Sequence, residues 1–267
     1  MRLEPELYRR HFESDARLLI EIAHRDLDLR IPSCPGWSMA TLVTHLAGIY
    51  AHRVKIVELR AKTNIVRGFE DLDLPMRFEP WFDAAFAEPA ALPERPDGLV
   101  ELLERTSARL AEVLWSADPN EVVYTWSSEQ SVGFWQRRMA HETAVHRWDS
   151  QLAGDRVTPI DGELAADGVD EVLEIMLPRW RSAVRAERPG SGESYCFRSL
   201  DRPGQWLIRF DRDSEVISRE LGPADVEVRA TASDLDLFLW GRDRSEGLEV
   251  LGQAALLERY FQMAPVG

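Results

Sequence analysis

The sequence predicts an α+β protein of two domains, an N-terminal four-helix bundle followed by a smaller α+β domain with an antiparallel sheet. Two observations lead to this prediction. Apolar residues recur at helical spacing in four segments of the first part of the chain. Four short runs between residues 194 and 230 instead alternate apolar with polar residues, as strands with one wet face do. We place the boundary near residue 157, which gives domains 1–157 and 158–267.

The four helices of the first domain follow from apolar spacing and from residues that start or stop a helix. We expect them over about residues 4–26, 38–61, 98–117 and 134–153. Ser38 is a favoured N-cap residue, Pro119 cannot continue a helix, and Gly154 is common just after a helix end. The segment E-V-V-Y-T-W before the fourth helix is either a strand or an extended crossing. Four helices with one long connection suit a bundle.

The pattern of apolar and polar residues changes from residue 161 onward. A helix is expected to about residue 184, ended or kinked at Pro178, and a loop rich in Gly, Pro and Ser follows it. The strand-like runs are S-Y-C-F-R-S-L, Q-W-L-I-R-F, S-E-V-I-S-R-E-L and V-E-V-R-A. Helices at residues 234–240 and 254–261 close the chain. This pattern predicts the α+β character of the second domain.

Composition limits the classes of partner. The net charge is −14 and no basic cluster follows a phosphate backbone, which argues against nucleic acid. No apolar run approaches the roughly 20 residues that cross a bilayer, and the N-terminal residues M-R-L-E-P-E-L-Y lack a secretory signal. Two cysteines far apart in sequence fit a reducing compartment. We therefore expect a cytoplasmic protein, either monomer or homodimer, that binds small molecules.

The segment H-E-T-A-V-H-R-W, residues 141–148, carries the most chemical information. Glu142 and His146 stand four residues apart, so they share one helix face and both can point at one ion. His141 is rotated by about 100° from Glu142 and should not face the same point. The segment resembles H-E-x-x-H, but its histidines have four residues between them instead of the three of that motif. A zincin-type zinc site is therefore excluded by spacing.

A third metal ligand would have to come from another helix. The second helix offers His45 and, seven residues later on nearly the same face, His52. These positions lie about 10 Å apart along the axis, so one ion cannot ordinarily take both. Two histidines and one glutamate form a known catalytic zinc set, and similar sets hold other divalent metals. The Glu/His pair could equally be a solvated helix pair, and spacing alone does not choose between these interpretations.

Two longer segments carry a resemblance to a known family. The stretch S-C-P-G-W-S-M-A-T-L-V-T-H-L-A-G, residues 33–48, and the stretch R-M-A-H-E-T-A-V-H-R-W-D, residues 138–149, resemble the two signatures of the mycothiol-dependent maleylpyruvate isomerase family. That family belongs to the DinB-like metal-binding superfamily. The later A-T-A-S-D-L-D-L-F-L-W-G-R, residues 230–242, is similar to the family's C-terminal domain, so the resemblance spans nearly the whole chain.

The resemblance implies a fold, a metal site and a co-substrate. It implies a DinB-like four-helix bundle followed by a sterol-carrier-like α+β domain. It also implies a divalent metal, zinc first and nickel, iron or manganese as alternatives, held by His45, Glu142 and His146. In such isomerases an arginine of the C-terminal domain assists catalysis, and Arg242 is our candidate for a catalytic residue, with Arg209 and Arg229 as alternatives. Mycothiol, a low-molecular-weight thiol, is the implied co-substrate.

A mechanism follows from such a metal. The thiolate, not the thiol, is the nucleophile, and a free thiol has a pKa of about 8.5. Coordination to a divalent cation would supply the thiolate at neutral pH for attack on a small electrophile. We therefore expect a metal-dependent, mycothiol-using thiol S-transferase or cis-trans isomerase. The alternatives are a non-catalytic protein that binds a lipid or other small molecule, and a metal-dependent hydrolase whose nucleophile is water.

Overall fold

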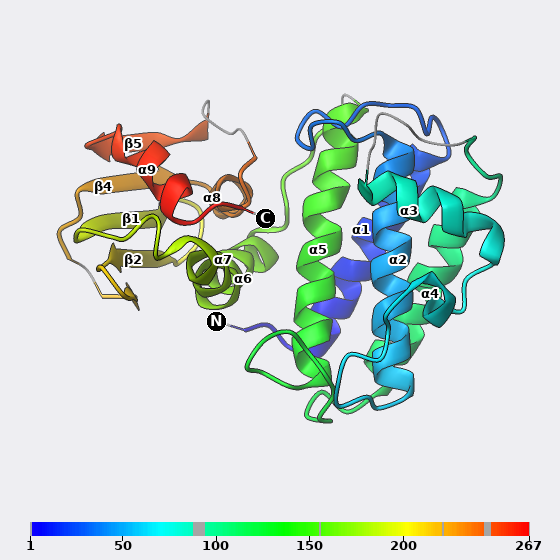
Figure 1. Ribbon diagram of the computed structural model, residues 1–267. Helices are drawn as coiled ribbons and strands as arrows, with labels where there is room; N and C mark the ends of the chain where they lie inside the picture. The colour runs from blue at the N-terminus through cyan, green and yellow to red at the C-terminus, as the bar shows by residue number, and fades with distance from the viewer. Residues whose placement is uncertain (1, 88–93, 155, 221, 243–246, 267) are drawn as a thin grey trace. The chain divides into compact units, whose positions relative to one another are not determined.

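The computed structural model describes the chain in five ranges, residues 2–87, 94–154, 156–220, 222–242 and 247–266. The chain groups into two compact units, one formed by Glu4–Thr158 and the other chiefly by Pro159–Gly267. Figure 1 shows a helical unit and a unit that combines helices with a sheet. The predicted α+β fold class is therefore confirmed, and each unit is described below by itself.

The helical unit is built around the four predicted helices. Their bounds are α1 Pro5–Ala23, α2 Met39–Glu58, α4 Leu99–Ser116 and α5 Val132–Ala153. Helix α1 packs against α4 and α5, and α2 packs against the same two helices, which is the pairing of a bundle (Figure 1). In the part of the chain that the structure describes, no helix is both long enough and apolar enough to cross a membrane.

Two of these helices begin at serine caps. The hydroxyl of Ser38 accepts a hydrogen bond from the backbone N–H of Thr41 at 3.3 Å, and the Thr41 hydroxyl accepts one from the Ser38 N–H at 3.4 Å. Ser131 caps α5 in the same way by accepting from the N–H of Phe134 at 3.1 Å. Each cap satisfies a backbone donor that has no partner within the helix. These caps fix where the two helices of the candidate site begin.

The long connection between α2 and α4 contains helices that the sequence pattern did not predict. They are the short 3-10 helices Phe69–Leu72 and Met76–Phe78 and the helix α3 Glu79–Ala87, which packs against α2. The E-V-V-Y-T-W segment is extended and forms no strand among the described residues. Its Tyr124 N–H donates to the Ala61 carbonyl at 2.6 Å, so the extended crossing is the correct alternative.

The second unit begins with an interrupted helix. Helix α6 covers Gly162–Glu171, a π-helical turn covers Val172–Met176, and α7 covers Leu177–Val184. Pro178 has no N–H to donate to the preceding turn, and its ring crowds the carbonyl four residues earlier. The helix meets this constraint by widening into a π-turn just before the proline instead of ending there.

The sheet of the second unit is mixed. Its strands are β1 Glu193–Ser199, β2 Gln205–Phe210, β3 Glu215–Ser218, β4 Val226–Ala230 and β5 Glu249–Gly252. Their order is β3-β2-β1-β4-β5, and every described pairing is antiparallel except that of β1 with β4. The parallel pair corrects the expectation of a wholly antiparallel sheet. It arises because β4 pairs with β1 on the side opposite to β2, after a connection that crosses from the β3 edge.

The core of this unit is aromatic. Tyr195 and Phe197 of β1, Phe210 of β2 and Tyr260 are fully buried, and their rings meet mostly edge to face at centroid distances between 5.3 and 5.8 Å. Tyr260 belongs to α9 Leu256–Met263, the second of the two predicted closing helices. The first, α8 Ala232–Leu239, packs against α6 and against β1 and β4. Helices thus cover the sheet, as an α+β unit requires.

Candidate metal centre

Three metal-ligating side chains converge inside the helical bundle. His45 lies on α2, and Glu142 and His146 lie one turn apart on α5. The Nε2 atom of His45 is 3.0 Å from Oε1 of Glu142, and Nε2 of His146 is 3.4 Å from the same oxygen. One donor atom from each residue lies within 4.8 Å of the other two. A pair of neighbouring helices therefore brings one ligand from α2 to the i, i+4 pair of α5.

The donor set fits a divalent cation. Two imidazole nitrogens and one carboxylate oxygen suit zinc and, with less selectivity, other first-row metals, and three protein ligands leave a coordination position for a small molecule. His52 is not part of the group, since its Nε2 atom lies 3.1 Å from the Asn64 carboxamide oxygen. His141 is buried and meets the ring of Tyr8 edge to face. The structure therefore brings together the three expected ligands and leaves out the other two histidines of these helices.

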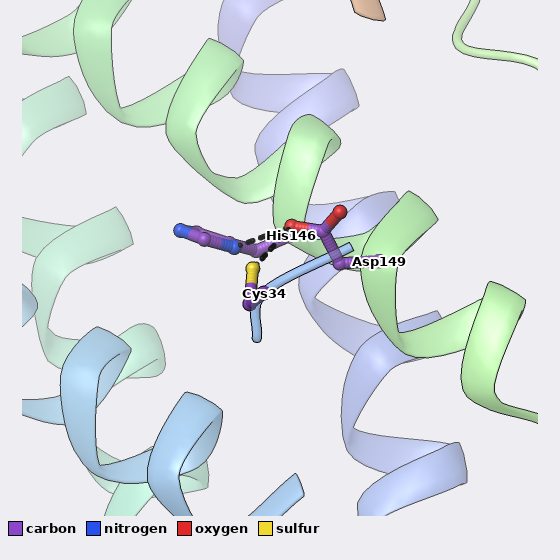
Figure 2. A group of neighbouring side chains, drawn as sticks. All are labelled: Cys34, His146 and Asp149. Atoms are coloured by element: carbon purple, nitrogen blue, oxygen red, sulfur yellow. Dashed lines mark hydrogen bonds and ion pairs between the residues drawn. The ribbon is translucent and has the colours of Figure 1, made fainter. Parts of the chain in front are cut away.

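A second group of polar side chains orients the His146 ring. The Nδ1 atom of His146 lies 2.9 Å from Oδ2 of the fully buried Asp149. The Ser33 hydroxyl donates to Oδ1 of Asp149 at 2.6 Å, and the Cys34 thiol donates to Oδ2 at 3.7 Å. Figure 2 shows the His146 ring and the Cys34 thiol both directed at this carboxylate. With a proton on Nδ1, the ring presents the lone pair of Nε2 to the side of Glu142.

Cys34, His146 and Asp149 also lie close enough together to hold an ion. Both groups contain His146. In this group Nδ1 of the ring faces Asp149, whereas in the first group Nε2 faces Glu142. The hydrogen bonds to Asp149 account for its geometry without an ion, so we assign it the role of fixing the imidazole.

The protonation states of the three ligands are set by burial and by Arg138. Burial alone would raise the pKa of Glu142, but the charge of Arg138, whose guanidinium pairs with Oε2, and hydrogen bonds from both histidines hold it well below its ordinary value. Burial lowers the pKa of His45 despite its hydrogen bond to Glu142. Burial also acts to lower the pKa of His146, yet the hydrogen bonds to Asp149 and Glu142 raise it. An ionised carboxylate and a neutral His45 are the forms that bind metals.

A cavity of about 620 Å³ opens beside His45. Helix α2, the segment after it and α3 line this cavity, with apolar side chains from Ile49, Phe69, Leu72 and Phe82 and cationic ones from Arg53 and Arg67. On the other flank, the ring of Trp37 lies 5.0 Å from the His45 ring and stacks at 6.2 Å on that of His146. The ligand group therefore has an aromatic wall and an adjoining space large enough for a small molecule.

The expected catalytic arginine belongs to the other unit. Arg242 follows α8, is half-buried, and donates to the Trp240 carbonyl at 2.8 Å. Arg209 bonds to Asp211 of its own hairpin, and Arg229 bonds to Glu227 of its own strand. Arg242 differs from both in having a backbone carbonyl among its partners, and its role stays a prediction.

The sequence pattern did not identify three polar residues of the site. Asp149 and Arg138 would be expected on a helix surface or at a cap, yet both are buried, one on the His146 ring and the other on Glu142. The signal that could have found them is their spacing, i+3 from His146 and i−4 from Glu142, which places each on the same helix face as a ligand. Arg53 shares a face of α2 with His45 in the same way, eight residues along.

Comparisons with known proteins bear on both units. Residues 9–151 match the family model of the mycothiol maleylpyruvate isomerase N-terminal domain, and residues 163–259 match that of the corresponding C-terminal domain. A crystal structure of the mycothiol-dependent maleylpyruvate isomerase is 16% identical, has a TM-score of 0.61 and is covered over 93% of each chain. A mutant of that isomerase gives 15%, 0.60 and the same coverage. At this identity the likeness shows a shared fold. Comparison with curated protein sequences found no match.

Proposed function

Because the chain belongs to the mycothiol maleylpyruvate isomerase family, we propose that it is an enzyme that joins mycothiol to a small electrophilic substrate at a divalent-metal site. His45, Glu142 and His146 would hold the metal. The reaction ends either in release of the thiol from an isomerised substrate or in transfer of the thiol to the substrate. Zinc is the first choice of metal on the chemistry of the donor set.

The observation that carries this proposal is the convergence of two imidazoles and one carboxylate beside a cavity. A divalent metal at these atoms lowers the pKa of a coordinated thiol, so that the thiolate forms at neutral pH. The cavity of about 620 Å³ lies within the usual size range of small-molecule sites and begins at His45. A thiol and an electrophile can therefore meet within reach of the ligand group.

The protein's own residues hold this group ready. Arg138 keeps Glu142 ionised, and Asp149 fixes the His146 ring with Nε2 facing Glu142. Trp37 contacts the two histidine rings on one flank. None of these side chains needs to rearrange before a ligand binds, because each is already held by a hydrogen bond or a ring contact. Arg242 is our candidate for the arginine that stabilises negative charge on the substrate.

Two other functions use the same site. A hydrolase would bind water in place of the thiol, and the donor set allows this. A binding protein would use the cavity and leave the three side chains with a structural metal. The cavity beside the three ligands favours a catalytic role, because a structural site has no need of an adjoining cavity.

The experiment is to measure metal content and turnover in one set of variants. Purified protein is assayed with maleylpyruvate and with a chloronitrobenzene, each with and without mycothiol. We expect wild type and the exposed-histidine control His24→Ala to hold stoichiometric metal, and His45→Ala and Glu142→Ala to lose it together with turnover. Turnover without thiol would favour the hydrolase. Stoichiometric metal in both ligand variants would refute the site.

A further inference from the structure

We propose that Cys34, Asp149 and the Nδ1 side of the His146 ring form a second metal site, which takes a soft, thiophilic ion such as Cd²⁺. The site is separate from the candidate metal centre of His45, Glu142 and His146, but both use the same imidazole. The proposal goes beyond the proposed function, because it needs neither mycothiol nor a substrate. It rests on the types of ligand atom, the distances between them and the way the chain holds the thiol.

The three side chains supply three different types of ligand atom. A thiolate sulfur, an imidazole nitrogen and a carboxylate oxygen are the donors that zinc takes in proteins, and a thiolate shifts the preference toward soft ions. Among the described residues, this group and the candidate metal centre each bring three such donor atoms within 4.8 Å of one another. Of the two, the group with Cys34 is the one that contains sulfur. The two groups should therefore select different ions.

The distances between the donor atoms fit an ion with small shifts. In a tetrahedral site with metal–sulfur bonds of about 2.3 Å and metal–nitrogen or metal–oxygen bonds of about 2.0 Å, sulfur and oxygen lie about 3.5 Å apart, and nitrogen and oxygen about 3.3 Å. Here Sγ of Cys34 is 3.7 Å from Oδ2 of Asp149, and Nδ1 of His146 is 2.9 Å from it. Figure 2 shows the thiol and the ring both directed at this carboxylate. Movements of a few tenths of an ångström would place all three atoms around one ion.

The chain holds these atoms in place and leaves the sulfur within reach of solvent. The Cys34 N–H donates to the Ile31 carbonyl at 3.1 Å, and the Cys34 carbonyl accepts from the Trp37 N–H at 2.9 Å. Asp149 is fully buried, and the Ser33 hydroxyl occupies its Oδ1 at 2.6 Å, so Oδ2 is the oxygen that faces the thiol and the ring. Cys34 itself is half-buried. An ion can therefore enter from the side of the loop that carries Cys34.

The ion replaces two protons that now point at Oδ2 of Asp149. The proton of the Cys34 thiol leaves to solvent, and the sulfur binds as the thiolate. The imidazole proton moves from Nδ1 to Nε2, which faces Oε1 of Glu142 at 3.4 Å, and no electron is transferred. The ring stays neutral and so has one lone pair to give. An ion at Cys34 therefore takes the His146 ring away from the candidate metal centre.

The test is a titration of the protein with Cd²⁺, followed by the ultraviolet charge-transfer band between thiolate and cadmium. Wild type should give a band that saturates at one thiolate per chain, and Cys34→Ser should lose it. Cys196→Ser is the matched control, because it removes the other cysteine, which is buried in β1 of the second unit, and it should keep the band. A band that persists in Cys34→Ser, or none in wild type, would overturn the proposal.

Further variants separate this site from the candidate metal centre. Glu142→Ala should keep the cadmium band, because Glu142 is a ligand of the candidate metal centre alone. Asp149→Asn should raise the Cd²⁺ concentration at half-saturation by at least about 10-fold, since loss of a ligand should cost no less than loss of an outer partner. Loss of the band in Glu142→Ala, or an unchanged midpoint in Asp149→Asn, would contradict the ligand set. Failure of the proposed function leaves these results unaffected, because they require neither turnover nor mycothiol.

A measurement on wild-type protein covers the case in which Cys34→Ser does not fold. Iodoacetamide alkylates accessible thiols, and peptide mass analysis distinguishes Cys34 from the buried Cys196. Alkylation of Cys34 should slow in proportion to the fraction of chains that hold Cd²⁺. Mg²⁺ should leave the rate unchanged, because this hard cation prefers oxygen ligands. Alkylation of Cys34 at the same rate with and without Cd²⁺ would refute the site.

Discussion

Asp149 accepts a hydrogen bond from Nδ1 of His146 at 2.9 Å, and both side chains are buried within one turn of α5. Since Ser33 and Cys34 also donate to this carboxylate, the imidazole is held from the side opposite to Glu142. Such partners of a metal-binding histidine fix its tautomer and raise its basicity. Asp149 is therefore a positioning residue of the candidate metal centre.

We expect Asp149→Asn to weaken metal binding about 10- to 100-fold, the usual effect of removing such a partner. The asparagine keeps the volume of the side chain, but it offers a neutral acceptor and can present an N–H to the ring instead. Competition with a chromophoric chelator measures the affinity. Asp211→Asn, at a partly exposed aspartate of a hairpin in the other unit, is the matched control. Unchanged metal affinity in Asp149→Asn would remove the positioning role.

His52 lies near His45 on the same face of α2, but we expect it to have no part in metal binding. We expect His52→Ala to keep stoichiometric metal, because its ring bonds to Asn64 and Arg53 instead of the ligand group. Metal analysis of the purified variant checks this outcome. Loss of metal in His52→Ala would indicate that His52 is a metal ligand.

The sequence was sufficient to predict the helical bundle and the Glu142/His146 pair, because both depend on short-range spacing. Glu142 and His146 face one point for the same reason that α5 is a helix, namely its period of 3.6 residues. The choice of His45 over His52 needed either the family resemblance or the structure, because both lie on one face of α2. The axial position of α2 against α5 decides it, and that depends on packing along the whole bundle.

The mixed sheet and the contact of Arg53 with Trp135 could not be predicted from the sequence for a similar reason. Alternation in V-E-V-R-A predicted β4, but nothing within a strand states which neighbour it pairs with or in which direction. Likewise, whether an arginine on a helix is solvated or buried depends on what covers it. For Arg53 this is Trp135, which is 82 positions further along the chain. Both features are long-range, and local patterns carry no signal for them.

The capping box of α2 should contribute measurably to stability. Ser38→Ala removes the acceptor of the Thr41 N–H and should lower the free energy of unfolding by about 1 kcal/mol, the typical cost of losing such a cap. Urea denaturation followed by circular dichroism measures the change. Ser191→Ala, at an exposed serine outside helices and strands, should leave the midpoint unchanged. Equal stability of the two variants would mean that the cap is dispensable.

The contacts of His52 with Arg53 and Asn64 predict how its ring responds to pH. Burial, together with the charge of Arg53, lowers the pKa of His52 from its ordinary 6.5 to about 4. The ring should therefore stay neutral at neutral pH, with Nδ1 as the acceptor for Arg53. The ring ¹³C and ¹⁵N shifts of His52 should give a titration midpoint near 4, and a midpoint near 6.5 would contradict the assigned hydrogen bonds. Arg53→Leu should raise the midpoint only in part, because burial is the larger cause.

The same shift fixes the sign of a stability change. Between pH 6.5 and about 4, His52 is protonated in the unfolded chain but neutral in the folded protein. As the pH falls through this window, the unfolded state therefore binds more protons than the folded state. The free energy of unfolding should therefore decrease on acidification through this window, and His52→Gln, which cannot titrate, should show a flatter profile. Urea denaturation at a series of pH values compares the two slopes. Parallel profiles would show that His52 takes up its proton equally in both states, which would contradict the lowered pKa of its ring.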